Sequence, residues 1–225
     1  MTRRHFLGLG AAGAAGLTAA SAAADAPLPE AVAEIAAKLS YLTPLDQFRM
    51  YGRGNPPPHT LSPEKRREVG LDPATWKLEV VPDPESDCKV ENPLSRERGN
   101  ALDWHGLMQR AERRAVRYLK VRTCTNGADP CGMGLWEGVP LRDVIWLAKP
   151  TANLRRIFYY GYHNDDPKQR FQSSLPIGRV LEDPPGEQPV ILCYKLNGQW
   201  LSPKAGAPVR MIVPEAYGNK SVKWL

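Results

Sequence analysis

The sequence has few cysteines, few histidines and no long run of strongly apolar residues. Its 225 residues include four cysteines and four histidines. Four cysteines are too few for a disulfide-stabilised scaffold in a domain of this size, and their spacing lacks the close pairs of a structural zinc site. No stretch reaches the roughly 20 strongly apolar residues that a spanning helix needs. We therefore expect a soluble mature chain with no stable membrane insertion.

Patterns that identify nucleotide and nucleic-acid binding are also missing. There is no glycine-rich nucleotide-binding fingerprint, no internal repeat, and no basic stripe interleaved with aromatic residues. The formal net charge of +6 is mild. One arginine cluster has helical spacing and comprises Arg110, Arg113, Arg114 and Arg117. This cluster indicates a solvated helix face or, alternatively, a docking patch for an acidic partner, and nucleic acid is not an expected partner.

The first 24 residues have the pattern of an export signal. Arg3 and Arg4 precede Phe6-Leu7, and a mildly apolar run rich in alanine and glycine follows and ends in small residues. The pattern is typical of a twin-arginine leader, which exports proteins after folding, with an ordinary secretory leader as the alternative. Export after folding suits a protein that receives its cofactor in the cytoplasm. We expect residues 1–24 to be the signal peptide, residues 25–225 to be the mature domain, and the periplasm to be its location.

Periodicity predicts helices and strands without regular alternation. Helices are expected at 29–39, 63–69, 103–118, 140–147 and 176–181, and strands at 75–80, 119–123, 156–162, 190–195, 199–201, 209–213 and 221–225. A glycine-rich turn is expected between Cys124 and Pro140. Asn197-Gly198 is the strongest hairpin signal in the chain. The order predicts an α+β fold, a single compact mixed-sheet domain. A last strand that runs to Leu225 indicates that the sequence is part of a longer chain.

Cys124 is the cysteine with the clearest chemical context. It follows the predicted strand 119–123 and precedes the turn Thr125-Asn126-Gly127, so its side chain is expected to face open space. The nearby Arg122 favours the thiolate, which can bind a metal or act as a nucleophile. A buried cysteine that packs as a small apolar residue is the alternative. Local features alone leave both interpretations open.

The residues after Cys124 resemble the sulfite oxidase family of molybdenum enzymes. The resemblance is carried by the Trp-x-Gly-Val-Pro-Leu segment at 136–141 and by segments 192–199, 206–214 and 221–225. It covers about residues 40–225, and 208–225 is its most specific part. The resemblance implies the family's molybdopterin-binding fold, a molybdenum–molybdopterin cofactor and two-electron oxygen-atom transfer on a small substrate. It also implies a separate haem protein as electron partner.

The resemblance assigns roles to a small set of residues. Cys124 would bind molybdenum, and its soft thiolate suits a transition metal. Arg53 would be catalytic by steering an anion. Arg210 would hold the pterin phosphate, for which a planar guanidinium provides paired donors. The full set expected to bind the cofactor is Tyr51, Gly52, Arg53, Asn55, Asn164, Arg210, Ser221, Val222 and Lys223.

Three positions depart from the sulfite-oxidising members of this family. Phe171 stands where they have a tyrosine, and their histidine before the cofactor arginine is replaced around Ala205. Their acidic loop residue aligns with Asn164, or alternatively with Asp166. His163 is either a pocket residue or a satisfied loop histidine. The substrate therefore stays open between a sulfur oxyanion such as sulfite and a sulfoxide, as in the related periplasmic methionine sulfoxide reductase, and a cofactor-free binding protein is a further alternative.

Overall fold

The computed structural model describes residues 41–51, 54–124 and 130–225, and within these ranges one compact unit runs from Tyr41 to Leu225. The predicted leader and the helix predicted at 29–39 lie outside the described residues, as do Gly52 and Arg53. In the described ranges, no helix combines the length and apolar character needed to cross a bilayer.

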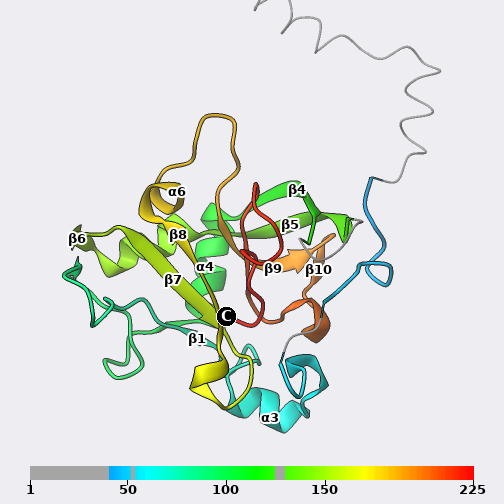
Figure 1. Cartoon of the computed structure of the whole chain (residues 1–225), viewed down its shortest axis with the longest axis horizontal. Helices are drawn as coiled ribbons and strands as arrows, with labels where there is room; N and C mark the ends of the chain where they lie inside the picture. Colours follow the sequence, from blue (N-terminus) through cyan, green and yellow to red (C-terminus); the bar gives the residue numbers. More distant parts are fainter. Residues whose placement is uncertain (1–40, 52–53, 125–129) are drawn as a thin grey trace, which may run out of the picture. The chain divides into compact units, whose positions relative to one another are not determined.

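A five-stranded antiparallel sheet forms the centre of this unit, in the order β10-β9-β5-β4 with β11 also paired to β9 (Figure 1). Its strands are β4 (Val116–Arg122), β5 (Gly132–Pro140), β9 (Ile191–Leu196), β10 (Gln199–Trp200) and β11 (Arg210–Ile212). The β9–β10 hairpin turns at Asn197 and Gly198, which have φ angles of 53° and 77°. Two positive φ angles in a two-residue loop match the right-handed twist of the strands, so the Asn-Gly hairpin prediction is confirmed.

Three two-stranded sheets and short helices surround the central sheet. The pairs are β1 (Lys77–Leu78) with β3 (Leu102–Asp103), β2 (Lys89–Val90) with β6 (Pro150–Ala152), and β7 (Arg156–Gly161) with β8 (Phe171–Pro176). The α-helices are α3 (Pro63–Glu68), α4 (Trp104–Arg114), α5 (Leu141–Ile145) and α6 (Ile177–Leu181), and the 3-10 helices are η1 (Pro58–Thr60), η2 (Trp146–Ala148), η3 (Pro167–Gln169) and η4 (Pro203–Ala205). This mixture of helices and antiparallel strands in one unit confirms the predicted α+β class.

Strand β4 places positively charged side chains in the interior of the protein. Its side chains alternate, so Tyr118, Lys120 and Arg122 are buried while the residues between them are exposed. On β5, the wholly buried Trp136 packs edge-on against Phe48, with ring centroids 6.0 Å apart. An apolar cluster around this tryptophan therefore supports one face of the sheet, and Lys120 and Arg122 share the face of β4 on which Tyr118 joins that cluster.

Between residues 103 and 140, the predicted end of one helix and one predicted turn were wrong. The helix expected at 103–118 ends at Arg114, because Ala115 is already extended and Val116 begins β4. The glycine-rich turn expected before Pro140 is largely strand β5. A side chain at Gly134 would place its Cβ 2.4 Å from Leu196 Cδ1, so the glycines there allow close packing instead of a turn.

The strand predicted at 221–225 was also wrong. The segment is irregular, and its backbone bonds to two different partners: the Val222 oxygen accepts from Met211, whereas the Trp224 oxygen accepts from Tyr162. Trp224 has a φ of 58°, which interrupts an extended conformation. The segment therefore joins the end of β7 to β11 and cannot follow a single ladder. The prediction also missed β8, whose residues had no clear alternation.

Candidate functional site

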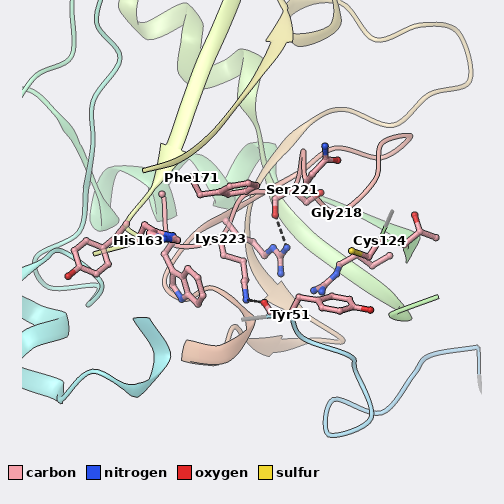
Figure 2. A pocket seen from close by; sticks show the side chains of 14 residues that line it. Tyr51, Cys124, His163, Phe171, Gly218, Ser221 and Lys223 are labelled. Atoms are coloured by element: carbon pink, nitrogen blue, oxygen red, sulfur yellow. Dashed lines mark hydrogen bonds between the residues drawn. The ribbon is translucent and has the colours of Figure 1, made fainter. Parts of the chain in front are cut away.

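One pocket brings the end of β4 together with the C-terminal segment (Figure 2). Cys124 follows β4 by two residues, Arg210 begins β11, and Ser221 and Lys223 lie in the irregular segment after it. The lining residues are Tyr51, Arg122, Thr123, Cys124, Gly161, Tyr162, His163, Phe171, Arg210, Gly218, Asn219, Ser221, Lys223 and Trp224. The fold thus places a thiol and a guanidinium that are distant in sequence in the same pocket.

The environment of Cys124 differs from that of the buried cysteines. Cys124 is a free thiol of intermediate exposure on the pocket wall. Cys193 is wholly buried, and burial raises the pKa of its thiol to about 12. Cys131 is 2% exposed and lies in the core. The alternative that Cys124 is a packed core cysteine does not describe this geometry, because its side chain borders a pocket.

Arg210 is the most deeply buried charge in the pocket. It is 1% exposed, and its guanidinium donates from Nη1 to the Ala205 oxygen at 2.7 Å and from Nη2 to the Ser221 oxygen at 2.8 Å. The ring of Trp136 lies 5.2 Å from its Cζ. Its buried Nε–H has no hydrogen-bond partner within the described residues. Burial, and then the charge of Arg122, lower the pKa of this guanidinium, so an anionic acceptor would stabilise it.

The charges of the pocket lining are all of one sign. Arg122, Arg210 and Lys223 line it, and the lining contains no aspartate or glutamate. Arg122 is 5% exposed and donates to the Arg49 oxygen at 2.9 Å, and Lys223 Nζ donates to the Tyr51 oxygen at 2.8 Å. These hydrogen bonds go to neutral carbonyl oxygens, which carry no negative charge. The arrangement is therefore suited to an anion.

Two glycines allow the backbone segments of the wall to approach each other closely. A Cβ on Gly161 would lie 1.9 Å from the Lys223 oxygen, and the neighbouring Tyr162 N–H donates to the Trp224 oxygen at 2.7 Å. A Cβ on Gly218 would lie 3.0 Å from the oxygen of Thr123, which accepts the Gly218 N–H at 2.8 Å. The end of β7 and the 218–224 segment are thus held against each other around the pocket.

The structure places four of the predicted cofactor-binding residues in the lining: Tyr51, Arg210, Ser221 and Lys223. Val222 is buried in the core beside them, 2% exposed. Gly52 and Arg53 lie outside the described residues, so the roles predicted for them stay predictions.

Two further predicted residues lie outside the pocket lining. Asn55 is exposed, at the cis bond to Pro56. Asn164 lies in the turn after β7, where its amide donates to Gln169 and its carbonyl oxygen accepts from the Asp166 N–H. In this geometry the Asn164 side chain stabilises its own turn.

Sequence reasoning did not assign a site role to several residues of the lining. Arg122 was named only as a positive neighbour of Cys124; its place in the lining could have been found from the alternation of β4, because it shares the buried face with Lys120. Phe171 and His163, identified from the resemblance as positions of interest, do line the pocket, at the two strand ends of β7 and β8. Trp224 and Gly161 had no local signal, because their placement depends on contacts between distant segments.

Comparisons with known proteins agree with this site. The sequence profile of the family described as "Oxidoreductase molybdopterin binding domain" matches residues 67–225. The chain therefore belongs to this family of molybdopterin-binding oxidoreductases, which includes sulfite oxidase and nitrate reductase. The cofactor that membership implies is molybdenum–molybdopterin.

Individual relatives are similar over only part of their length. A mitochondrial sulfite oxidase of Rattus norvegicus is 31% identical over 167 residues, which cover 69% of this chain and 29% of that protein. An NADPH nitrate reductase of Pichia angusta is 33% identical over 99 residues, covering 44% of this chain and 11% of that protein. The structure of the sulfane dehydrogenase SoxCD from Paracoccus pantotrophus has a TM-score of 0.54 at 19% identity, covering 89% of this chain and 52% of that chain, which shows the fold alone.

The residues of the pocket fit this cofactor. Its anionic phosphate needs donors, and Arg210 offers a buried Nε–H that has no partner in the described part of the chain. Its metal needs a soft ligand, and Cys124 supplies a thiol on the same wall. Within the described ranges, no group of three or more His, Cys, Asp or Glu side chains could hold a metal ion. A metal at Cys124 would thus need further ligands from the cofactor itself.

Proposed function

We propose that this chain is an exported molybdenum-dependent oxidoreductase that transfers an oxygen atom, with two electrons, to or from a small sulfur compound. The observation that carries the proposal is a partly exposed thiol, Cys124, in the same pocket as the buried guanidinium of Arg210. A ligand with a thiolate-binding metal at one end and an anionic group at the other matches this pair. The leader pattern of residues 1–24 supports export to the periplasm in the folded state.

The chain's own residues would bind and orient the cofactor. Arg210 would donate its Nε–H to the anionic group, and Lys223 would add a positive charge from the same wall. Cys124 would ligate molybdenum, and Arg122 lines the same pocket. When bound, molybdenum–molybdopterin supplies the redox centre for oxygen-atom transfer. Trp224 and Phe171 contribute aromatic surface to the wall, which limits the access of water.

Oxidation of a sulfur oxyanion is the first candidate reaction. Sulfite and water would give sulfate, two protons and two electrons, so the oxygen atom comes from water and the electrons leave to a separate acceptor. The positive lining of the pocket supports an anionic substrate, because Arg122 and Lys223 would attract it into the site.

Reduction of a sulfoxide is the second candidate, and Phe171 favours it. This residue lines the pocket at the position where sulfite-oxidising relatives are expected to carry a tyrosine, and it has no hydroxyl to bond an oxyanion. A sulfoxide is neutral and has apolar substituents that a phenyl ring can contact. Its reduction would consume two electrons and two protons and would release a sulfide and water.

Purified holoprotein assayed in both directions separates the two reactions. Sulfite with an oxidising dye tests the first, and a sulfoxide with a reduced dye tests the second, with Cys124→Ser as the inactive control in each. Turnover of either substrate that is lost in Cys124→Ser supports the proposal. Equal rates in wild type and Cys124→Ser would rule it out.

Replacing Arg3 and Arg4 by lysine should keep the protein in the cytoplasm.

A further inference from the structure

We propose that the outer face of the β7–β8 ribbon is the docking surface for an acidic redox protein that exchanges electrons with the pocket. The ribbon face is defined by Arg156, Phe158, Tyr160, Arg170, Gln172 and Ser174. The inference rests on the proposed function, because only an oxidoreductase needs such a partner. It adds to that function a location and a charge for the partner.

The ribbon face exposes two large aromatic rings next to each other on one strand. Phe158 is 60% exposed and Tyr160 is 50% exposed, whereas Ile157, Tyr159 and Gly161 turn inward. Directly opposite on β8 are Ser174 and Gln172, which are too small or too polar to cover the rings. Exposed aromatic side chains beside arginines are the composition of binding hot spots.

The charges of the ribbon face are positive and lack carboxylate partners. The Arg170 guanidinium lies 4.5 Å from the centroid of the Tyr160 ring, and Arg156 donates to the hydroxyl of Ser174 at 2.8 Å. Among the residues that the structure describes, neither arginine forms an ion pair. The six residues of the face include no aspartate or glutamate. A partner with acidic groups around an apolar centre would complement this surface.

The carboxylates nearest along the chain are engaged elsewhere. Asp165 accepts from Tyr162 and pairs with Lys65 Nζ at 3.2 Å. Asp166 caps the short helix η3, where it accepts the Lys168 N–H at 2.9 Å. Neither therefore neutralises the ribbon face, which keeps its positive charge at the surface.

The inner side of the same ribbon forms part of the pocket wall (Figure 2). Gly161, at the end of β7, and Phe171, at the start of β8, both line the pocket and pair with each other. Tyr159 points inward and donates to the Lys220 oxygen at 2.8 Å, which ties the ribbon to the C-terminal segment. The ribbon thus contributes its end to the pocket wall, and Tyr160 on the outer face is the chain neighbour of Gly161 in that wall.

Electron balance explains why repeated docking on an accessible face is needed. Oxidation of one sulfite by water releases two electrons, and a haem carrier accepts one when its iron goes from ferric to ferrous. Two carriers must therefore dock in turn for each substrate. For a sulfoxide reductase the direction is reversed, and two ferrous carriers supply the electrons. Fast exchange of partners favours a small charged surface over a large apolar one.

The test compares charge reversal on the ribbon face with the same reversal elsewhere. The double variant Arg156→Glu/Arg170→Glu is compared with Arg113→Glu/Arg114→Glu, whose arginines are exposed on α4. The two variants have equal net charge. The dissociation constant for a purified acidic c-type cytochrome is measured by titration at low ionic strength, with a basic c-type cytochrome as the second probe. Titration measures binding without turnover.

We expect the ribbon variant to weaken binding of the acidic cytochrome about tenfold or more, and the α4 variant to change it little. Tyr160→Ser should also weaken it, while molybdenum content and turnover with a small dye stay unchanged. Equal effects of the two charge variants, a larger effect on α4, or a preference for the basic cytochrome would overturn the docking surface. Dissociation of a homodimer by the ribbon variant would also overturn the docking surface, because the face would then bind a second copy of this chain. A wild type that contains no molybdenum, or that does not turn over the dye, would instead contradict the proposed function.

Discussion

At the scale of single residues, the pocket depends on buried positive charge. Arg210 and Arg122 are 1% and 5% exposed, and Lys120 on the same face of β4 is 7% exposed. Burying cations is unfavourable unless they are hydrogen bonded or bind an anion. In this chain backbone carbonyls satisfy part of the requirement, and the Nε–H of Arg210 is left over for a ligand.

Arg210→Lys tests the role of the planar guanidinium. The lysine keeps the positive charge, but its three N–H groups share one nitrogen and cannot reproduce the planar fork whose separate nitrogens reach Ala205, Ser221 and an anion. Losing a charge-assisted hydrogen bond costs about 1.5–3 kcal/mol, so we expect molybdopterin occupancy at limiting cofactor to fall at least about tenfold. Occupancy is measured as pterin fluorescence after oxidative release. Unchanged occupancy in a folded variant would contradict the role of Arg210.

Lys120 makes the free energy of unfolding depend on pH in the alkaline range. Burial lowers the pKa of its ammonium from 10.5 to about 8, and the charges of Arg122 and Arg210 act in the same direction. Between these two pH values the folded protein has released a proton that the unfolded chain still binds, so Lys120 makes the free energy of unfolding rise with pH. Below about pH 8 the lysine is charged in both states and its contribution is constant.

Lys120→Met removes this titration and keeps the aliphatic stem. The free energy of unfolding of the wild type minus that of the variant should increase by on the order of 2–3 kcal/mol from pH 8 to 10.5. Urea unfolding at several pH values measures it, and ionisation of buried Cys193 largely cancels in the difference. A flat difference would show that Lys120 keeps its ordinary pKa, and a falling difference would show that its pKa is raised; either contradicts the prediction.

At the scale of elements, the site depends on contacts between the strand ends and the C-terminal segment. The sequence predicted β7, β9, α6 and the Asn197-Gly198 hairpin, because each has a local pattern of alternation or turn residues. It did not predict β5, since its glycines were interpreted as a turn although they make room for Phe48 and Leu196. Helix α4 was extended too far, because helical spacing continued in sequence into β4.

The residues of the candidate site also fall into two groups: those that the sequence identified and those that it did not. Cys124 and Arg210 were identifiable from the sequence because they stand beside recognisable segments. Gly161 and Trp224 were not, because their roles arise only where β7 meets residues 218–224. Segment 221–225 was predicted as a strand, yet its backbone bonds to two separate partners. No pattern within five residues can show such divided pairing.

Gly161→Ala tests the contact between β7 and the C-terminal segment. The new Cβ would lie 1.9 Å from the Lys223 oxygen, so backbone must move to accommodate it. We expect a loss of stability of about 2 kcal/mol or more, together with lower cofactor occupancy. Gly178→Ala in α6 is the matched control, because nothing lies within 4 Å of its added Cβ. The control should be neutral or slightly stabilising, since alanine favours helix.

If both glycine variants have the same stability and occupancy, the close approach of β7 to Lys223 is not needed for the site. Urea unfolding and pterin content measure the two quantities on the same preparations. A change in occupancy without a change in stability would place the effect in the pocket alone.

At the scale of the whole molecule, membership in the molybdopterin-binding family and the charge of the pocket agree. The family match covers residues 67–225, and the pocket draws residues from Tyr51 to Trp224. The chain covers 29% of the rat sulfite oxidase and 11% of the yeast nitrate reductase. Substrate and electron partner must therefore be established on this protein itself.

The most direct measurement is the molybdenum content per chain of the purified wild type, of Cys124→Ser and of Cys131→Ser, by elemental mass spectrometry. Cys131 is the matched control, since it precedes β5 and is buried in the core. We expect one molybdenum per chain in the wild type, retention in folded Cys131→Ser, and loss in Cys124→Ser. A metal-free wild type from cells that make the cofactor, or full molybdenum in Cys124→Ser, would contradict it.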